Sequence, residues 1–262
     1  MKNRIIVIII LLSLWLLTSC GGAAPAEEAP AAEAPAEEAP AAAPDELFVL
    51  ESAVWESNSI NICWENPNQN NQREREFIQA AIENTWEAVS LIDFIGWGEC
   101  ENEASGIRIQ ISDESPQTKG LGTNIDGLEN GMVLNITFNN WGCVDLSGNR
   151  TPCVFPYHGY SRDDYIRITA VHEFGHALSF AHEQNRDDTP SWCDTPQGAE
   201  GTMPIGGWDQ DSVMNYCNPR WSGNGNLSAT DIIGVQTIYG AKIIQKECRK
   251  FDDQLQKPHI LE

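Results

Sequence analysis

The spacing of apolar residues predicts several strands and helices after residue 46. Three short segments alternate between apolar and polar positions, a pattern typical of strands: 60–64, 106–112 and 131–138. Two longer segments, 72–93 and 163–180, repeat apolar residues at helical spacing. A last helix is predicted near the C-terminus, between a start signal at Ser228 and Asp231 and a stop signal at Gly240.

The order of these elements indicates the fold class. A strand, a helix and two strands precede the helix at 163–180, and a long stretch rich in Gly and Pro separates it from the last helix. This order predicts an α+β domain with a sheet-based upper lobe and an irregular lower lobe. We expect the folded domain to span residues 47–242, followed by a C-terminal tail at 243–262.

The N-terminus has the pattern of an export signal. Lys2 and Arg4 precede an apolar run that is shorter than the roughly 20 residues needed to span a bilayer. The run ends in Leu-Thr-Ser-Cys, which resembles the bacterial lipobox and implies a lipidated Cys20 as the mature N-terminus. The alternative is an ordinary signal peptide that contains a cysteine. We expect residues 1–20 to be the signal and the protein to be anchored to a bacterial membrane, facing outside the cytoplasm.

Residues 21–46 are a near-repeat of Ala, Pro and Glu without an aromatic or β-branched residue. Such a segment cannot form a core and is expected to be a disordered, extended tether. The whole chain has a formal net charge of −22. This acidity argues against nucleic acid or anionic lipid surfaces as partners, although it also fits simple solubility.

Seven cysteines follow Cys20, and in an exported chain they are candidates for disulfides. Proximity along the chain suggests the pairs Cys143–Cys153 and Cys193–Cys217, with Cys63–Cys100 as a third. Cys248 would remain unpaired. No C-x-x-C pair occurs, so a metal site built from thiols is not expected.

The stretch "TAVHEFGHALSFAHEQNR" holds three of the five histidines of the chain. His172 and His176 are four residues apart, so on a helix both can face one ion, while Glu173 beside them can act as a general base. This is the zinc-binding pattern H-E-x-x-H; the alternative is a chance cluster of core histidines. His182 could not reach the same ion on an unbroken helix. If the helix ends near Ser179 and the chain turns back, His182 completes a three-histidine zinc site with one position open to water.

Here a family resemblance applies. "HEFGHALSFAHEQNR" resembles the zinc signature of the metzincins, and "FAHEQNR" that of their astacin branch; "DSVMNY" at 211–216 resembles the family's methionine turn. The resemblance implies a metzincin-type domain with a twisted mixed sheet and helices in the upper lobe, and an irregular lower lobe that ends in the C-terminal helix. It places Met214 under one zinc ion and makes Tyr216 a weak ligand or a stabiliser of the oxyanion.

The implied function is a zinc metalloendopeptidase, which hydrolyses peptide bonds of proteins with a metal-activated water and Glu173 as the general base. The segment 131–138 is either the edge strand that pairs with an extended substrate or an ordinary internal strand. A competing interpretation keeps this fold but places the enzyme among the metzincins that resemble matrix metalloproteases, and Tyr216 after the methionine turn argues against it. A surface binding module with a structural zinc is another, although such a site normally has a fourth protein ligand.

Ser179 departs from the family pattern, whereas Glu183 matches it. Ser179 stands where relatives have glycine, because the turn requires a positive φ, and a non-glycine residue there costs about 1–2 kcal/mol. Glu183 would in astacins contact the freed N-terminus of the mature enzyme. In this chain a tethered N-terminus would not reach that site without further cleavage, and the sequence contains no recognisable inhibitory prosegment.

Overall fold

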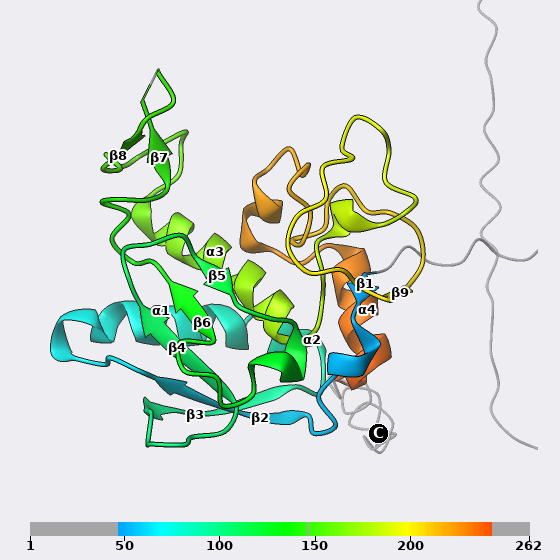
Figure 1. Cartoon of the computed structure of the whole chain (residues 1–262), viewed down its shortest axis with the longest axis horizontal. Helices are drawn as coiled ribbons and strands as arrows, with labels where there is room; N and C mark the ends of the chain where they lie inside the picture. The colour runs from blue at the N-terminus through cyan, green and yellow to red at the C-terminus, as the bar shows by residue number, and fades with distance from the viewer. Residues whose placement is uncertain (1–46, 146, 243–262) are drawn as a thin grey trace, which may run out of the picture. The chain divides into compact units, whose positions relative to one another are not determined.

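The computed structural model describes residues 47–145 and 147–242 (Figure 1). The expected signal peptide, tether and C-terminal tail lie outside the described residues, so those domain boundaries remain predictions. The α-helices are α1 (Gln72–Glu83), α2 (Trp86–Val89), α3 (Arg162–Ala177) and α4 (Ala229–Tyr239). The strands are β1 (Phe48–Val49), β2 (Ser59–Trp64), β3 (Asp93–Glu99), β4 (Ile107–Ile111), β5 (Gln117–Thr118), β6 (Met132–Leu134), β7 (Cys143–Val144), β8 (Arg150–Thr151) and β9 (Met203–Pro204).

The central sheet is mixed and has the strand order β3-β2-β4-β6-β5. The pairs β3–β2, β2–β4 and β4–β6 are parallel, whereas β5 pairs with β6 in the antiparallel sense. The apolar alternation predicted for these strands puts side chains such as Ile60, Ile62, Ile107 and Ile109 into the core. α3 packs against α1 and against β5 and β6, so it lies between the sheet edge and the rest of the domain (Figure 1).

The predicted strands at 60–64 and 106–112 are confirmed as β2 and β4. The strand predicted at 131–138 ends at Leu134, and it is internal because β4 and β5 flank it. The edge strand is instead β5, a two-residue strand that the sequence pattern did not indicate. Its shortness explains this, since two residues carry no periodicity.

The helix predicted at 72–93 is interrupted. The Asn84 amide donates to Ala80 O at 2.7 Å, and the Thr85 hydroxyl donates to Ala81 O at 2.7 Å. These side-chain bonds compete with the helix ladder and separate α1 from α2. The chain then enters β3 at Asp93, a strand that was not predicted because Gly96 and Gly98 weaken its pattern.

The helix that carries two of the histidines is fixed at both ends. Ser161 accepts a hydrogen bond from the backbone N–H of Asp164 in a capping box, which sets the start of α3. Near the other end, the Phe174 ring packs on Phe94 (5.1 Å between centroids) and Trp97 (5.7 Å) of the sheet. This aromatic contact turns the opposite face of α3, with its histidines, away from the sheet.

The chain reverses immediately after α3, at Ser179. This residue has φ +73° and is fully buried. Its hydroxyl donates to Leu50 O at 2.6 Å, and its carbonyl accepts from Leu50 N at 3.0 Å. Phe48 O then accepts from Ala181 N at 2.7 Å. The serine therefore adopts a left-handed conformation that usually favours glycine, and its hydroxyl binds the N-terminal segment.

The remainder of the domain, residues 183–228, is largely irregular (Figure 1). β9 in this lobe pairs with β1. The last helix is confirmed as α4, with a capping box between Ser228 and Asp231 and a C-terminal Gly240 at φ +85°. The three predicted disulfides, Cys63–Cys100, Cys143–Cys153 and Cys193–Cys217, are all present. Cys248 lies outside the described residues.

Among the described residues, no helix combines the length and apolarity needed to cross a membrane.

The turn at Ser179 yields a stability prediction. Ser179→Ala keeps the left-handed backbone but loses the hydrogen bond to Leu50, so we expect it to lower the free energy of unfolding by about 1 kcal/mol. Ser179→Gly loses the same bond but also removes the left-handed penalty of about 1–2 kcal/mol, so it should be more stable than the alanine variant. Urea unfolding of both variants measures this difference, and an alanine variant as stable as wild type would contradict the account of the turn.

Candidate metal centre

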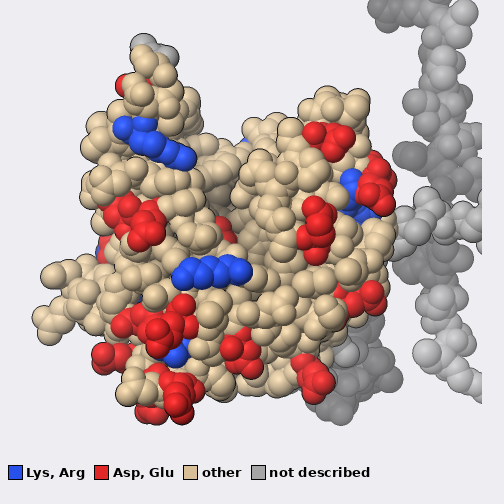
Figure 2. All heavy atoms as spheres, in the orientation of Figure 1, with Lys and Arg blue, Asp and Glu red and all other residues tan. Residues whose placement is uncertain are grey.

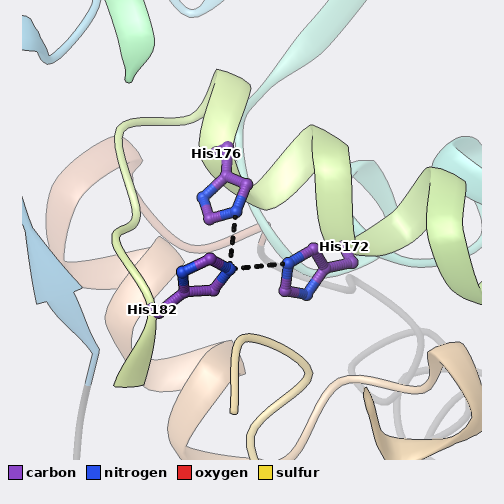
Figure 3. Close-up of side chains that lie close together, drawn as sticks. All are labelled: His172, His176 and His182. Carbon is purple, nitrogen blue, oxygen red and sulfur yellow. Dashed lines mark hydrogen bonds between the residues drawn. The ribbon is translucent and has the colours of Figure 1, made fainter. Parts of the chain in front are cut away.

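The structure brings the three clustered histidines together. His172 and His176 project from α3, and His182 returns to them after the turn at Ser179 (Figure 3). His182 Nε2 lies 3.2 Å from Nε2 of His172 and 3.2 Å from Nε2 of His176. All three side chains are buried, and one ligand atom from each lies within 4.8 Å of the others.

The other ring nitrogen of each histidine contacts a backbone carbonyl at 2.8 Å. The partners of His172, His176 and His182 are the carbonyl oxygens of Val213, Phe180 and Gln197. A carbonyl oxygen can only accept, so each Nδ1 must carry the hydrogen. In the neutral rings, each Nε2 then presents a lone pair.

Burial keeps these rings neutral. It lowers the pKa of His172 to about 3, with a further contribution from His182, and it lowers the pKa of His176 well below its ordinary value. Burial also lowers the pKa of His182. Three lone pairs therefore converge without a hydrogen between them, and they cannot bond to one another. Such a donor set fits a cation, and three neutral imidazoles are typical ligands of Zn²⁺.

Glu173 lies beside this cluster on α3, with its side chain buried. Burial raises the pKa of the Glu173 carboxyl to about 7, and hydrogen bonding to Thr118 opposes this rise. The Thr118 hydroxyl, on the edge strand β5, lies 2.9 Å from Glu173 Oε2 and 3.0 Å from its backbone oxygen. The carboxylate is therefore held at the junction of α3 and the sheet edge.

The methionine turn packs against α3 at Gly175. Met214 is fully buried, and its sulfur would lie only 2.3 Å from a Cβ atom built on Gly175. Gly175, between Glu173 and His176, is thus the position at which only glycine lets Met214 approach α3 this closely. This contact explains the glycine of the H-E-F-G-H sequence.

The cap of the last helix holds this turn in place. Asp231 is fully buried, and its carboxylate accepts from the Ser212 hydroxyl at 2.7 Å and from Val213 N at 2.8 Å. Val213 in turn provides the carbonyl for His172. A continuous set of hydrogen bonds therefore runs from α4 to the histidine cluster.

Tyr216 lies against the open side of the cluster and is 48 % exposed. Its ring stacks on His172 with 5.4 Å between centroids and packs on His182 at 4.4 Å. Its backbone N–H donates to Gln184 Oε1 at 3.1 Å. The phenol is therefore next to the site and partly exposed.

Glu183 lies away from the open side, in the interior of the lower lobe. Its carboxylate is fully buried, accepts from Asp209 N at 3.1 Å and lies 3.4 Å from Nε of Arg186. Burial raises the pKa of Glu183 to about 9, although Arg186 opposes this. That a tethered N-terminus does not reach Glu183 without further cleavage stays a prediction.

Sequence reasoning missed three residues that support the cluster. Thr118 lies in a strand too short to predict, and Gln197 acts through a backbone carbonyl, which no side-chain pattern encodes. Asp231 was recognised only as a helix start signal. Its second role, binding the methionine turn 18 residues earlier, depends on tertiary structure.

A cleft opens beside the cluster, and Figure 2 shows the corresponding hollow across the middle of the visible face. It contains two cavities of about 370 and 390 Å³. Pro116, Glu173, Gln197 and Tyr216 line both, so the cavities adjoin at the candidate catalytic residues. This arrangement gives an extended chain access to the metal site from two sides.

Comparison with known proteins supports the fold. No family model matches the chain, and no curated protein matches it in sequence. A solved structure of myroilysin matches at 20% identity and TM-score 0.50, covering 74% of this chain and 99% of that one. High choriolytic enzyme 1, a hatching enzyme zinc-protease from Oryzias latipes (Medaka fish), matches at 20% identity and TM-score 0.44, over 73% of this chain and 96% of that one.

The likeness to myroilysin concerns the fold, since the identity is low. The architecture is the one expected from the sequence: a sheet, the helix α3 with its histidines, an irregular lower lobe and the C-terminal helix α4. The chain thus shares the α+β fold of myroilysin.

Proposed function

We propose that the protein is a zinc-dependent endopeptidase of the astacin-like metzincin type. The observation that carries the proposal is the convergence of three imidazole lone pairs, each fixed by a backbone carbonyl at 2.8 Å, next to a buried glutamate. His172, His176 and His182 would hold one Zn²⁺. When bound, the ion would lower the pKa of a water and polarise the substrate carbonyl.

The three histidines leave an open side, and this favours a catalytic over a structural site. A structural zinc normally has four protein ligands. From this side Tyr216 packs on both His172 and His182, and its side chain is partly exposed. The geometry thus leaves room for water and substrate.

Glu173 is the proposed general base. Its carboxylate is buried on the cleft wall, and this burial raises its pKa to about 7. A general base works best when its pKa lies near the pH of the reaction, so this value suits the role at neutral pH. It would take a proton from the attacking water and deliver it to the leaving amine. Thr118 holds the carboxylate through its hydroxyl, so the base is already oriented toward the cleft.

Tyr216 would assist by donating from its phenol to the oxyanion that forms on the substrate carbonyl. The substrate backbone would pair with the free edge of β5, which replaces the internal strand β6 as the candidate for this role. Pairing through main-chain hydrogen bonds fits a protein or peptide substrate, because it makes little demand on side chains.

The activity is tested with casein as a general protein substrate. Glu173→Ala should retain its zinc but lose activity by about 10²–10⁴-fold, because it removes the proton acceptor and none of the ligands. Wild type should lose its activity when a zinc chelator is added and regain it with zinc. Glu56→Ala, at an exposed glutamate, is the matched control and should remain active.

Zinc content is measured on every sample. An active Glu173→Ala protein would contradict the assigned base, and wild-type cleavage that resists the chelator would contradict the metal mechanism.

We further propose that the protein is exported and anchored through lipid on Cys20. The charged start, the apolar run and the Leu-Thr-Ser-Cys sequence support this proposal. Three disulfides in the described domain also fit an oxidising compartment. Double acylation would hold the domain at a membrane, whereas a single chain binds weakly.

Cys20→Ser should abolish the anchor. In a bacterial host, we expect the wild-type protein to incorporate labelled palmitate and to fractionate with membranes, and the variant to do neither. Label in the Cys20→Ser protein, or none in wild type, would contradict lipidation at this residue.

A further inference from the structure

We propose that the cavity formed by Trp141, Ile168, Trp221 and their neighbours binds a large, uncharged, preferably aromatic side chain. This side chain belongs to the substrate residue that follows the cleaved bond, and Trp141 determines the selectivity. The inference rests on the proposed function and specifies its substrate.

The cavity directly adjoins the candidate metal centre. It has a volume of about 370 Å³ and is lined by His172 and Glu173 on one side. Trp141, Ile168 and Trp221 supply large apolar surfaces, and Thr169, Ser115 and Ser222 supply small polar ones. Apolar walls with a few polar groups are typical of pockets for uncharged ligands.

The charges around the cavity disfavour an acidic side chain. Glu173 is the charged side chain of the lining, and no Lys or Arg lines it among the described residues. Arg150 lies nearby, with its guanidinium 4.7 Å from the centroid of the Trp141 ring. That cation stacks on the aromatic wall instead of entering the lining. A substrate carboxylate would therefore lose its hydration without gaining a direct partner.

The walls of the cavity are held by constrained segments. Trp141 belongs to the arm that carries β7 and β8, which the Cys143–Cys153 disulfide closes. Trp221 begins a run of five residues with positive φ, 221–225, which includes non-glycine residues at a cost in backbone strain. Its ring packs on Tyr165 at 4.3 Å. Both aromatic walls are thus positioned before a substrate arrives.

The direction of the substrate follows from the sheet edge. Ser115 and Pro116, before β5, line this cavity, whereas Lys119, Gly120 and Leu121, after β5, line the other. A peptide that pairs with β5 in the more stable antiparallel sense runs from the second cavity toward the first. The residue after the cleaved bond then enters the cavity with Trp141.

Peptides that differ only at the residue after the cleaved bond test the proposal on the zinc-loaded full chain. We expect kcat/KM for Phe to exceed that for Ala by about 10–100-fold, and Asp to be no better than Ala. Trp141→Ala should reduce the ratio of kcat/KM for the Phe peptide to that for the Ala peptide about 10-fold. Trp141→Phe should restore most of the ratio.

Trp192→Ala is the matched control, since Trp192 is 61 % exposed and does not line the cavity. Casein fragments identified by mass spectrometry provide a second measurement, in which Phe, Tyr, Trp and Leu should be enriched after the cleaved bonds. A preference for Asp or Lys, no enrichment in a casein digest, or an unchanged ratio in Trp141→Ala would overturn this inference and leave the peptidase proposal intact. Absence of any zinc-dependent cleavage would overturn both.

Discussion

The approach of three imidazole lone pairs to within bonding distance of one cation is the constraint on which the rest of the structure depends. Nε2 atoms 3.2 Å apart without a hydrogen between them repel one another, so the protein must impose their positions. It does so with three carbonyl groups from different parts of the chain, at Phe180, Gln197 and Val213. These carbonyls accept from the Nδ1–H groups of the three rings and so set the tautomer and the orientation of each imidazole together.

This dependence explains how an irregular lower lobe can support a precise site. The Cys193–Cys217 disulfide closes the segment that supplies the carbonyls of Gln197 and Val213. Asp231 fixes the same segment from the start of α4, through bonds to Ser212 and Val213. Regular secondary structure is therefore unnecessary here, because cross-links and buried hydrogen bonds define the path of the chain.

The N-terminal strand has a comparable effect on the other side of the cluster. β1 pairs with β9 and also bonds to the turn at residues 179–181, which directs the chain back toward α3. The turn carries a serine in the left-handed region, and its hydroxyl donates to the carbonyl oxygen of Leu50, the residue that follows this strand. The position of His182 thus depends on residues more than 120 positions earlier in the chain.

The sequence allowed much of this to be predicted, for reasons visible in particular residues. Some features depend only on residues a few positions apart, so the sequence alone predicts them. They are the spacing of His172 and His176, the capping signal at Ser228 and the alternation in β2 and β4. The sequence also predicted the three disulfide pairs, because each pair joins two consecutive cysteines of the chain.

Other features required the three-dimensional structure. β5 is too short to have a period, and β3 is weakened by glycines. The break between α1 and α2 depends on side-chain bonds of Asn84 and Thr85 that a helical pattern does not reveal. The walls contributed by Trp141 and Trp221 come together only in the folded chain.

A crystal structure of the zinc-loaded protein tests the central claim most directly. The account predicts one zinc bound by Nε2 of His172, His176 and His182 at about 2.0–2.1 Å, with water in the remaining position beside Glu173. The three carbonyl contacts to the Nδ1 atoms should be retained. Zinc bound elsewhere, or a fourth protein ligand that closes the site, would contradict it.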